Sequence, residues 1–467
     1  MDVYDVIVVG GGNAALCAAL AARHHAPHVL LLERAPVHMR GGNTRHTRNI
    51  RCARVANGCS AEQYSEAEFL EDLIGVTGGP ENLELAKFAI RESRKLPAWM
   101  SEHGISWQPP LAGTLHLGSA NLWFLGGGKA LVNAYYDTAI RMGIEVRYDA
   151  FVEDLLIEEG SFRAAVIKCG ENQELVHGRT VVVAAGGFEA NIEWLKRFWG
   201  EAADNFCVRG TPYNDGKMLA ILLEKHAQPI GDPKRCHAVA IDARAPKYDG
   251  GIVTRVDAIP FGIVVNRTGQ RFYDEGENIW SKRYAIWGRL IAEQPGQAAY
   301  CIVDSKTIGC FLPPIYKPSQ SESVEGLSSC LKLDAGALVE TVRNYNEASV
   351  GNVEFHPERL DGLKTRGLDP PKSNWALPID QPPFYGLPLR PGITFTYMGV
   401  AVDDRTRVLE RTGRPFENVY AAGEIMSGNI LTQGYLAGFG LTIGSVFGQL
   451  AGKEAANHSH LRSGRRG

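Results

Sequence analysis

Apolar and polar positions near the N-terminus predict a strand, a helix and a second strand. Residues 4–9 (Tyr-Asp-Val-Ile-Val-Val) are a short β-branched run, as in a buried parallel strand. An Ala-rich stretch then continues to Arg23 and predicts a helix, and residues 28–32 predict the second strand. This order is typical of an α/β fold.

The turn after the first strand carries a characteristic spacing of small residues. Gly10, Gly12 and Ala15 form the pattern G-x-G-x-x-A. The first glycine of such a pattern permits a tight turn, the second lets the backbone approach a pyrophosphate, and the third small residue keeps helix and strand close. Glu33 ends the second strand about 20 residues further on, where a carboxylate can bind ribose hydroxyls. The segment therefore predicts a dinucleotide site.

Two later segments favour FAD over NAD. Residues 180–189 and 418–424 each predict a buried strand that ends in small residues, and the second closes with Gly423 and Glu424. Both strand ends resemble those that close over the cofactor in two-dinucleotide-binding-domain flavoproteins, whereas a nicotinamide dehydrogenase does not need a nucleotide-site strand so late in the chain. The absence of a second G-x-G-x-x-G pattern argues against an NAD(P)H site of the disulfide-reductase kind.

Composition limits the class of protein. The 467 residues are 45% hydrophobic and 22% charged, as in a soluble globular protein, and 52 glycines indicate many tight turns and close approaches to a ligand. The net charge of −3 gives no general attraction to nucleic acid or to an anionic membrane. We therefore expect no nucleic-acid partner.

The cysteines and the N-terminus indicate the compartment. Cysteine occurs nine times, scattered and without a Cys-x-x-Cys pair, which predicts no metal centre and a reducing environment. The apolar stretch 6–22 is short and broken by glycines, and the N-terminus lacks a basic segment, so neither a membrane span nor a signal peptide is expected. These features predict a cytoplasmic protein, either free or held at the inner membrane through a redox partner.

Three blocks resemble the flavoprotein superfamily of fumarate reductases and succinate dehydrogenases. They are the N-terminal fingerprint, residues 40–44 (Arg-Gly-Gly-Asn-Thr) and residues 266–275 (Asn-Arg-Thr-Gly-Gln-Arg-Phe-Tyr-Asp-Glu), with support from Ala-Ala-Gly-Glu at 421–424. The resemblance implies a Rossmann-like FAD-binding domain of the glutathione-reductase type with an inserted α+β capping domain. It divides the chain into residues 1–238 (FAD-binding, first part), 239–372 (capping and substrate domain) and 373–467 (FAD-binding, second part, with a frayed basic tail).

The resemblance also assigns the cofactor contacts. The residues that it places against FAD are Gly10, Gly12, Asn13, Ala14, Ala15, Glu33, Arg34, Gly41, Gly42, Asn43, Thr44, Ala185, Gly186, Gly423, Glu424, Gly438, Gly440 and Leu441. In membrane-bound members, a histidine of the Ser-His-Thr loop is linked covalently to the flavin. Here that loop reads Asn43-Thr44-Arg45, with His46 displaced, which favours non-covalent FAD.

Within the superfamily the chain resembles tricarballylate dehydrogenases, on residues 41–51 and 434–440. The flavoprotein half of a cobalamin-pathway oxygenase shares these blocks and remains an alternative. Fumarate reductases carry a His-x-Thr motif where this chain has residues 394–399, and a carboxylate-binding arginine where it has Tyr435. A plain fumarate reductase is therefore disfavoured. An oxidoreductase of the fumarate/succinate type that acts on another di- or tricarboxylate remains an alternative.

A cationic segment follows the glycine pair that the superfamily places along the flavin. Residues 40–54 contain Arg40, Arg45, Arg48, Arg51 and Arg54 with His46 and no acid. Because guanidinium groups bind carboxylates bidentately, Arg45, Arg48 and Arg51 are candidates for holding an anionic substrate. The alternative is a solvated basic face. Further candidates for substrate contact are His237, Thr254, Arg255, Thr396 and Tyr397.

The reaction implied by the resemblance also needs a group that moves a proton. In the superfamily an arginine after the 271–275 block has this role, and Arg283 is the candidate if four residues are inserted. An arginine is a poor base, so His46, Glu277, Tyr397 and Tyr435 are alternatives.

The resulting hypothesis is an FAD-dependent dehydrogenase that oxidises tricarballylate to cis-aconitate. A hydride would pass to flavin N5 while a proton leaves from the opposite face of the substrate. Electrons would then pass to a separate redox protein, for example a membrane-bound one with iron–sulfur clusters. The alternatives are a flavin subunit of a tetrapyrrole monooxygenase and a flavoprotein module without its own substrate.

Overall fold

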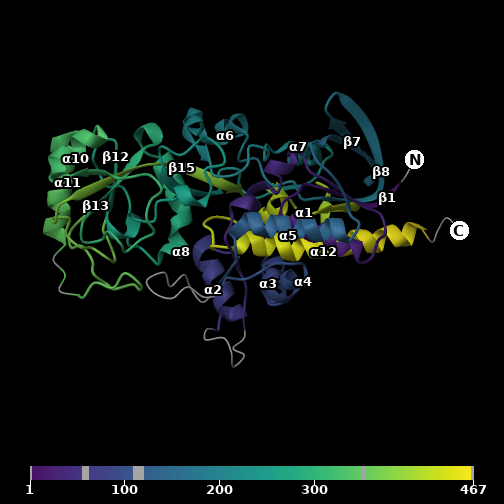
Figure 1. The fold of residues 1–467 in the computed structure, drawn as a ribbon, viewed down its shortest axis with the longest axis horizontal. Coiled ribbons are helices and arrows are strands. Elements are labelled where there is room, and N and C mark those ends of the chain that lie inside the picture. The colour runs from purple at the N-terminus through teal and green to yellow at the C-terminus, as the bar shows by residue number, and fades with distance from the viewer. Residues whose placement is uncertain (1–2, 55–62, 109–119, 350, 352, 464–467) are drawn as a thin grey trace.

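The computed structural model describes residues 3–54, 63–108, 120–349, 351 and 353–463. They form a mixed α/β fold in two parts, each built around a sheet, and Figure 1 shows the parts side by side. Both ends of the chain lie at the right-hand end, beside the first sheet (Figure 1).

The first sheet has the strand order β17-β18-β8-β1-β2-β5. These strands are β1 (Tyr4–Val9), β2 (Val29–Leu32), β5 (Glu145–Arg147), β8 (Asn172–Val183), β17 (Arg407–Leu409) and β18 (Pro415–Ala421). The pairs β18–β8, β8–β1, β1–β2 and β2–β5 are parallel, with Val6 opposite both Val29 and Thr180. The predicted strands at 4–9 and 28–32 are confirmed, whereas β8 ends at Val183 and leaves residues 184–189 as loop. Beyond β8 the sheet continues antiparallel through β7 (Ser161–Cys169) to β6 (Phe151–Glu158).

Helices α1 (Asn13–Arg23), α5 (Gly127–Arg141) and α12 (Phe439–Ser463) run alongside one another beside this sheet (Figure 1). Helix α12 lies directly on α1, because a Cβ at Gly448 or Gly452 would come within 2.5 or 2.0 Å of the carbonyl oxygen of Ala14 or Ala18. The expected frayed tail is corrected here, since α12 continues through Ser463, while residues 464–467 lie outside the described residues.

The second sheet has the order β11-β15-β13-β12, with β9 and β14 also paired to β15. These strands are β9 (Cys207–Val208), β11 (Cys236–Asp242), β12 (Ile263–Asn266), β13 (Ala299–Asp304), β14 (Ser319–Ser321) and β15 (Phe384–Thr396). Alternate residues of β12 enter different cores: Val264 packs in the cluster of α9 (Trp287–Ala292), and Ile263 and Val265 pack in the cluster of α11 (Ala335–Ala348). The sheet is therefore covered on both faces.

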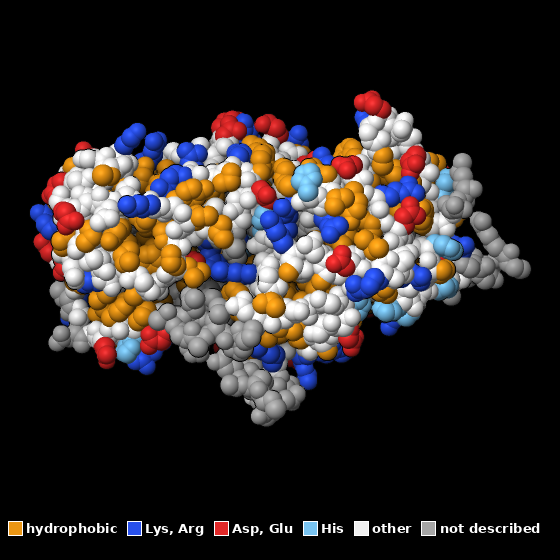
Figure 2. All heavy atoms as spheres, in the orientation of Figure 1, with side chains coloured by type: hydrophobic (Ala, Val, Ile, Leu, Met, Phe, Trp, Pro, Cys, Tyr) orange, Lys and Arg blue, Asp and Glu red, His pale blue; other side chains and the backbone are white. Residues whose placement is uncertain are grey.

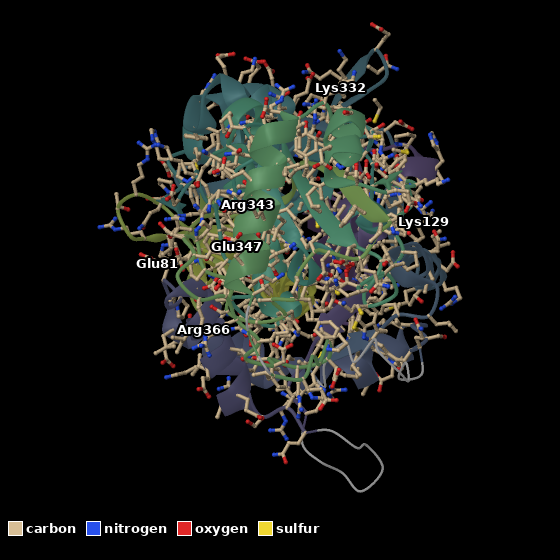
Figure 3. All side chains as sticks on the ribbon, turned by 90° about the vertical axis from the view of Figure 1, so that its left-hand side faces the viewer. Glu81, Lys129, Lys332, Arg343, Glu347 and Arg366 are labelled. Atoms are coloured by element: carbon tan, nitrogen blue, oxygen red, sulfur yellow. The ribbon has the colours of Figure 1, made fainter. Side chains whose placement is uncertain are left out.

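Helix α10 (Val324–Leu331) packs beside α11 at the end of the molecule farthest from the termini (Figure 1). Seen from that end, Arg343 and Glu347 lie on the exposed face of α11 (Figure 3). The predicted boundary at 372/373 assigns β15 to the FAD-binding part, yet β15 is hydrogen-bonded to β11 and β13 of the second sheet. The predicted division into domains remains a prediction.

The remaining elements cover the first part and the junction. They are α2 (Glu66–Thr77), α3 (Leu83–Ser93), α4 (Leu96–Glu102), α6 (Ile192–Trp199), α7 (Lys217–Glu224), α8 (Trp280–Arg283), β3 (Asn49–Arg51), β4 (Asn121–Trp123), β10 (Pro229–Ile230) and β16 (Gly399–Val400). Basic and acidic side chains are interspersed over the face in Figure 2. Within the described residues, no helix is both long enough and apolar enough to cross a lipid bilayer.

Candidate active site

The carboxyl ends of the parallel strands meet at one edge of the first sheet and open into a cavity. Gly10 follows β1, Glu33 follows β2, Ala184 follows β8 and Ala422 follows β18. The cavity contains about 1580 Å³ of empty space, part of it open to solvent, and extends to residues of the second sheet such as His237. The predicted cofactor residues that line it are Gly10, Gly12, Asn13, Ala14, Glu33, Arg34, Gly42, Asn43, Thr44, Ala185, Gly186, Gly423, Glu424, Gly438, Gly440 and Leu441.

Ala15 and Gly41 do not line the cavity. Ala15, in the first turn of α1, is completely buried. Gly41 supports the loop from behind, because its φ is +103° and a Cβ there would come within 2.7 Å of Val132. Both residues therefore shape the site through packing, which corrects their prediction as cavity contacts.

The two glycines of the first turn have different roles. Gly10 has a φ of +118°, and a Cβ there would lie 2.3 Å from the carbonyl oxygen of Ala184, so the fold itself requires glycine. Gly12 has a φ of −81° at the start of α1, and a Cβ there would meet only Thr44 Oγ1 at 3.4 Å and Gly41 O at 3.6 Å. The space in front of Gly12 therefore belongs to the cavity, as a phosphate cradle at a helix N-terminus requires.

Glu33 lies buried at the nucleotide edge of the cavity. Its carboxylate accepts hydrogen bonds from the backbone N–H groups of Ala35 (2.8 Å) and Gly41 (3.3 Å). Burial raises the pKa of Glu33, although these hydrogen bonds oppose the rise. The contacts hold the carboxylate beside the glycine turn, so the predicted ribose contact is sterically available.

A pair of buried carboxyl groups lies where Asn43 meets the end of β15. Glu189 accepts hydrogen bonds from the side-chain amides of Asn43 (2.6 Å) and Asn214 (2.7 Å). Glu424 accepts one from Thr396 N at 2.7 Å. Burial raises the pKa of both acids, and the charge of Glu189 raises that of Glu424 further. The pair therefore favours a state that holds a proton.

Three guanidinium groups line the other end of the cavity. They belong to Arg48, to Arg209 directly after β9, and to Arg255. Nε of Arg48, and Nε and Nη1 of Arg209, are buried without a hydrogen-bond partner among the described residues. Burial, together with the charge of nearby Arg255, lowers the pKa of Arg48 and of Arg209 to about 10. Buried charge without a partner is costly, so this arrangement calls for an anionic ligand.

Arg255 differs because it already has an acid beside it. Its Nη2 donates to Asp257 at 2.9 Å, and Asp257 also accepts from Trp280 Nε1 at 2.7 Å. Burial opposes the charge of Arg255, but Asp257 outweighs burial and raises the pKa of Arg255. The cavity therefore contains two guanidinium groups, those of Arg48 and Arg209, with buried nitrogens that have no hydrogen-bond partner among the described residues, and a third that is paired with an acid.

Aromatic and imidazole rings complete this end. His237 from β11 stacks on Tyr435 with ring centroids 4.1 Å apart, and Tyr284 meets His237 edge-on at 5.4 Å. Burial, followed by the charges of Arg209 and Arg255, lowers the pKa of His237 well below its usual value. His46 also lines the cavity and pairs with Asp249, and burial lowers its pKa to about 4.

Several predicted substrate and catalytic residues are not brought to the cavity. Arg51 donates to Tyr64 Oη at 2.7 Å and to Ala437 O at 3.1 Å and pairs with Asp72, because β3 turns its side chain into the protein. Arg45 contacts His38 O and Asp249. These contacts correct the expectation that both arginines face the substrate, whereas Arg48 does line the cavity.

Arg283 is also corrected. It is the last residue of α8, where it pairs with Glu277 and donates to Tyr273 Oη at 2.9 Å, outside the cavity lining. Three other predicted residues use their hydroxyl groups in hydrogen bonds within the protein: Thr254 donates to Gly251 O, Thr396 to Glu424, and Tyr397 to Gly434 O. Among the predicted substrate and catalytic residues, those that line the cavity are His46, Arg48, His237, Arg255 and Tyr435.

Sequence analysis missed Arg209 and Tyr284. Arg209 stands alone before Gly210-Thr211-Pro212, with no other cation nearby to attract notice. Tyr284 follows directly after Arg283, whose charge makes it the more obvious candidate in the sequence. Neither position has a local pattern that distinguishes a cavity residue from a core residue, so their location comes from tertiary packing alone.

Comparisons with known proteins define the class. Residues 5–441 match the FAD binding domain family. A curated NADH:fumarate oxidoreductase of Klebsiella pneumoniae is 25% identical over 98% of this chain, which spans 48% of that relative. Fumarate reductase (cytochrome) of Shewanella frigidimarina is 26% identical over 98% of this chain and 78% of its own length. A flavocytochrome c3 fumarate reductase in its open conformation has a similar fold, with a TM-score of 0.76 at 21% identity, covering 98% of this chain and 79% of that one.

The fold, the glycine cradle and the cavity are those of an FAD-binding flavoprotein. The chain belongs to the FAD binding domain family and is similar in sequence to proteins named as fumarate reductases. The relatives that the chain matches are named as oxidoreductases, and the family model marks the chain as FAD-binding. The residues present fit that cofactor, because the open space in front of Gly12 and Gly42 is what an approaching pyrophosphate needs.

We expect the flavin to be released when the purified protein is precipitated with acid. The loop at residues 43–45 carries no histidine, and the imidazole of the nearby His46 is paired with Asp249. The measurement is flavin absorbance in the supernatant and in the washed pellet. Colour that stays with the pellet would indicate a covalent link, and loss of that colour in His46→Ala would identify the residue.

Proposed function

We propose that the protein is a dehydrogenase of a small polycarboxylate and that tricarballylate, oxidised to cis-aconitate, is its substrate. The observation that carries the proposal is that Arg48 and Arg209 line the FAD cavity with buried guanidinium nitrogens that have no hydrogen-bond partner among the described residues. Guanidinium groups are suited to carboxylates because their planar donors match both oxygens. The cationic residues therefore bind and orient the carboxylates.

The other end of the cavity would hold FAD. The first turn of α1 at Gly12 would receive the pyrophosphate, Glu33 the adenosine ribose, and Asn43, Thr44 and Glu424 the flavin and its side chain. FAD supplies a hydride acceptor at N5. The chain would hold the substrate carboxylates at Arg48 and Arg209, and the stacked rings of His237 and Tyr435 would exclude water from the same end of the cavity.

A dicarboxylate substrate is the second candidate. Because Asp257 neutralises Arg255, the three guanidinium groups leave two positive charges to be matched. Two carboxylates would match them directly, as in a succinate- or fumarate-type oxidoreductase. Fumarate reductases are among the relatives by name, which supports this candidate.

We further propose that electrons leave to a separate redox protein. The chain has no Cys-x-x-Cys pair, and within the described residues no group of three or more His, Cys, Asp or Glu side chains could hold a metal ion. One relative is named as a cytochrome-type fumarate reductase, which supports a haem or iron–sulfur partner.

The test is anaerobic mixing of the FAD-loaded protein with di- and tricarboxylates, followed by absorbance of the flavin. We expect tricarballylate to bleach the flavin and succinate to do so less well, because the third carboxylate adds a contact in a cationic cavity. Monocarboxylates are the control and should leave the spectrum unchanged. Absence of bleaching with every polycarboxylate would contradict the proposed function.

A further inference from the structure

Arg283, the first candidate for the proton-transfer step, lies outside the cavity lining. Its neighbour Tyr284 has the opposite orientation: the side chain is 5% exposed and lines the cavity. The change of direction occurs where α8 ends at Arg283 and a 3-10 turn begins at Tyr284. Tyr284 comes from the second part of the molecule, whereas the glycine cradle of Gly10 and Gly12 comes from the first.

The surroundings of the Tyr284 ring are polar and charged on several sides. The guanidinium of Arg255 lies 4.8 Å from its ring centroid, and His237 meets it edge-on at 5.4 Å. No hydrogen bond of its hydroxyl to another described residue is recorded, in contrast to Tyr435 Oη, which accepts from Gly440 N, and Tyr397 Oη, which donates to Gly434 O. Among these three tyrosines, Tyr284 alone lines the cavity with a hydroxyl that makes no hydrogen bond to another described residue.

We propose that Tyr284 is the residue that exchanges the proton with the substrate, at the carbon next to a carboxylate. This inference rests on the proposed polycarboxylate function. It gives the oxidised bond a proton acceptor in the part of the cavity where the carboxylates are held by Arg48 and Arg209.

In the oxidative direction, the phenolate oxygen of Tyr284 takes the proton alpha to a carboxylate, and the electrons of that C–H bond form the second bond of the C=C. The adjacent carbon releases a hydride, carrying two electrons, to FAD. Tyr284 thereby becomes neutral phenol. In the reductive direction the phenol returns the proton and the hydride comes back from the cofactor.

A tyrosine suits this step better than an arginine. A phenol has an ordinary pKa of about 10, against more than 12 for a guanidinium, so its base form is more accessible near neutral pH. Burial raises the pKa of Tyr284, and the nearby arginines oppose that rise. The charged and titratable groups that interact with Tyr284 electrostatically or by ring contact are Arg48, Arg51, Arg209, Arg255, His237, Tyr397 and Tyr435.

The raised pKa of Tyr284 determines how the rate of each direction of the reaction depends on pH. Because the phenol stays protonated at neutral pH, the fraction of phenolate increases about tenfold per pH unit below the pKa. The rate of substrate oxidation should therefore rise with pH, and the rate of product reduction should stay level until the pH approaches that pKa. This opposite behaviour distinguishes a proton-transfer role from a purely structural one.

The experiment uses the FAD-loaded protein and Tyr284→Phe, with Tyr273→Phe as the matched control. Tyr273 is a half-buried tyrosine of the same part, bonded to Glu277 and Arg283 and outside the cavity lining. Stopped-flow absorbance gives the rate of flavin reduction by tricarballylate across pH, and calorimetry gives its dissociation constant. FAD content and melting temperature report on folding.

For Tyr284→Phe we expect flavin reduction at least about 10²-fold slower, loss of the pH slope, and a dissociation constant within about threefold of wild type. Tyr273→Phe should match wild type. Flavin reduction by Tyr284→Phe within threefold of wild type, with the slope kept, would overturn the proposal, as would a loss confined to the dissociation constant. A wild-type flavin that no polycarboxylate reduces would overturn the proposed function and this role with it.

Discussion

Arg209→Met is expected to weaken the binding of tricarballylate by about 30- to 5000-fold. Removing one partner of a buried, charge-assisted contact costs about 2–5 kcal/mol, and each 1.4 kcal/mol is a factor of ten in affinity. Methionine is an unbranched apolar residue of comparable volume, so the variant removes the charge and the hydrogen-bond donors while most of the space stays filled. Calorimetry on the FAD-loaded protein at low and high salt is the measurement.

The same variant should not be less stable than wild type when no substrate is bound. Arg209 is completely buried near Arg48 and Arg255, and two of its nitrogen atoms have no partner among the described residues. Removing such a charge relieves both desolvation and like-charge repulsion. A weakened affinity together with an unchanged melting temperature therefore separates a binding role from a structural one.

Arg289→Met is the matched control. Arg289 lies on α9, forms an exposed ion pair with Glu293 at 2.8 Å, and does not line the cavity. We expect its affinity within about twofold of wild type, since exposed pairs contribute only about 0–1 kcal/mol. Equal, small effects of both variants that disappear at 1 M salt, where the Debye length is about 3 Å, would contradict a cationic substrate site.

Gly12→Val is expected to abolish FAD retention, so that the variant purifies without yellow colour. We expect the variant to lose the cofactor but to keep its fold, because a Cβ at Gly12 meets no protein atom closer than 3.4 Å. The side chain would occupy the space where the pyrophosphate approaches the first turn of α1. The measurement is the ratio of flavin to protein absorbance after purification.

The control for this variant is Gly75→Val. Gly75 lies in α2 and a Cβ there meets nothing within 4 Å, so the variant adds the same side chain far from the cofactor cradle. Circular dichroism should show both variants folded, and Gly75→Val should retain a full complement of FAD. A full complement in Gly12→Val would contradict the assignment of the glycine cradle.

The nucleotide half of the site was predictable because its signals are local. The β-branched run before Gly10, the spacing of Gly12 and Ala15, and the acid at the end of the next strand all lie within one strand–helix–strand unit. Parallel pairing then brings the ends of β8 and β18 to the same edge. Most cofactor residues predicted in this way therefore line the cavity.

The cationic segment was only half predictable. Its charges are visible in the sequence, but the direction of each side chain depends on how the loop docks. Arg48 faces the cavity, whereas Arg51, three residues later, is directed by β3 toward Tyr64, Asp72 and the backbone of Ala437. Charge density alone does not distinguish a ligand-binding arginine from one that holds two segments together.

The sequence by itself determined the cofactor class, since strand order and glycine spacing are properties of neighbouring residues. Tertiary structure decided the substrate end, because Arg48, Arg209 and Arg255 come from three segments that meet only when the second sheet packs against the first. The neighbouring residues Arg283 and Tyr284 show that a difference of one position in the sequence separates a residue outside the cavity from one that lines it. At the junction of α8 with the following turn, the side chain of Arg283 forms an ion pair outside the cavity, whereas the side chain of the next residue, Tyr284, lines the cavity.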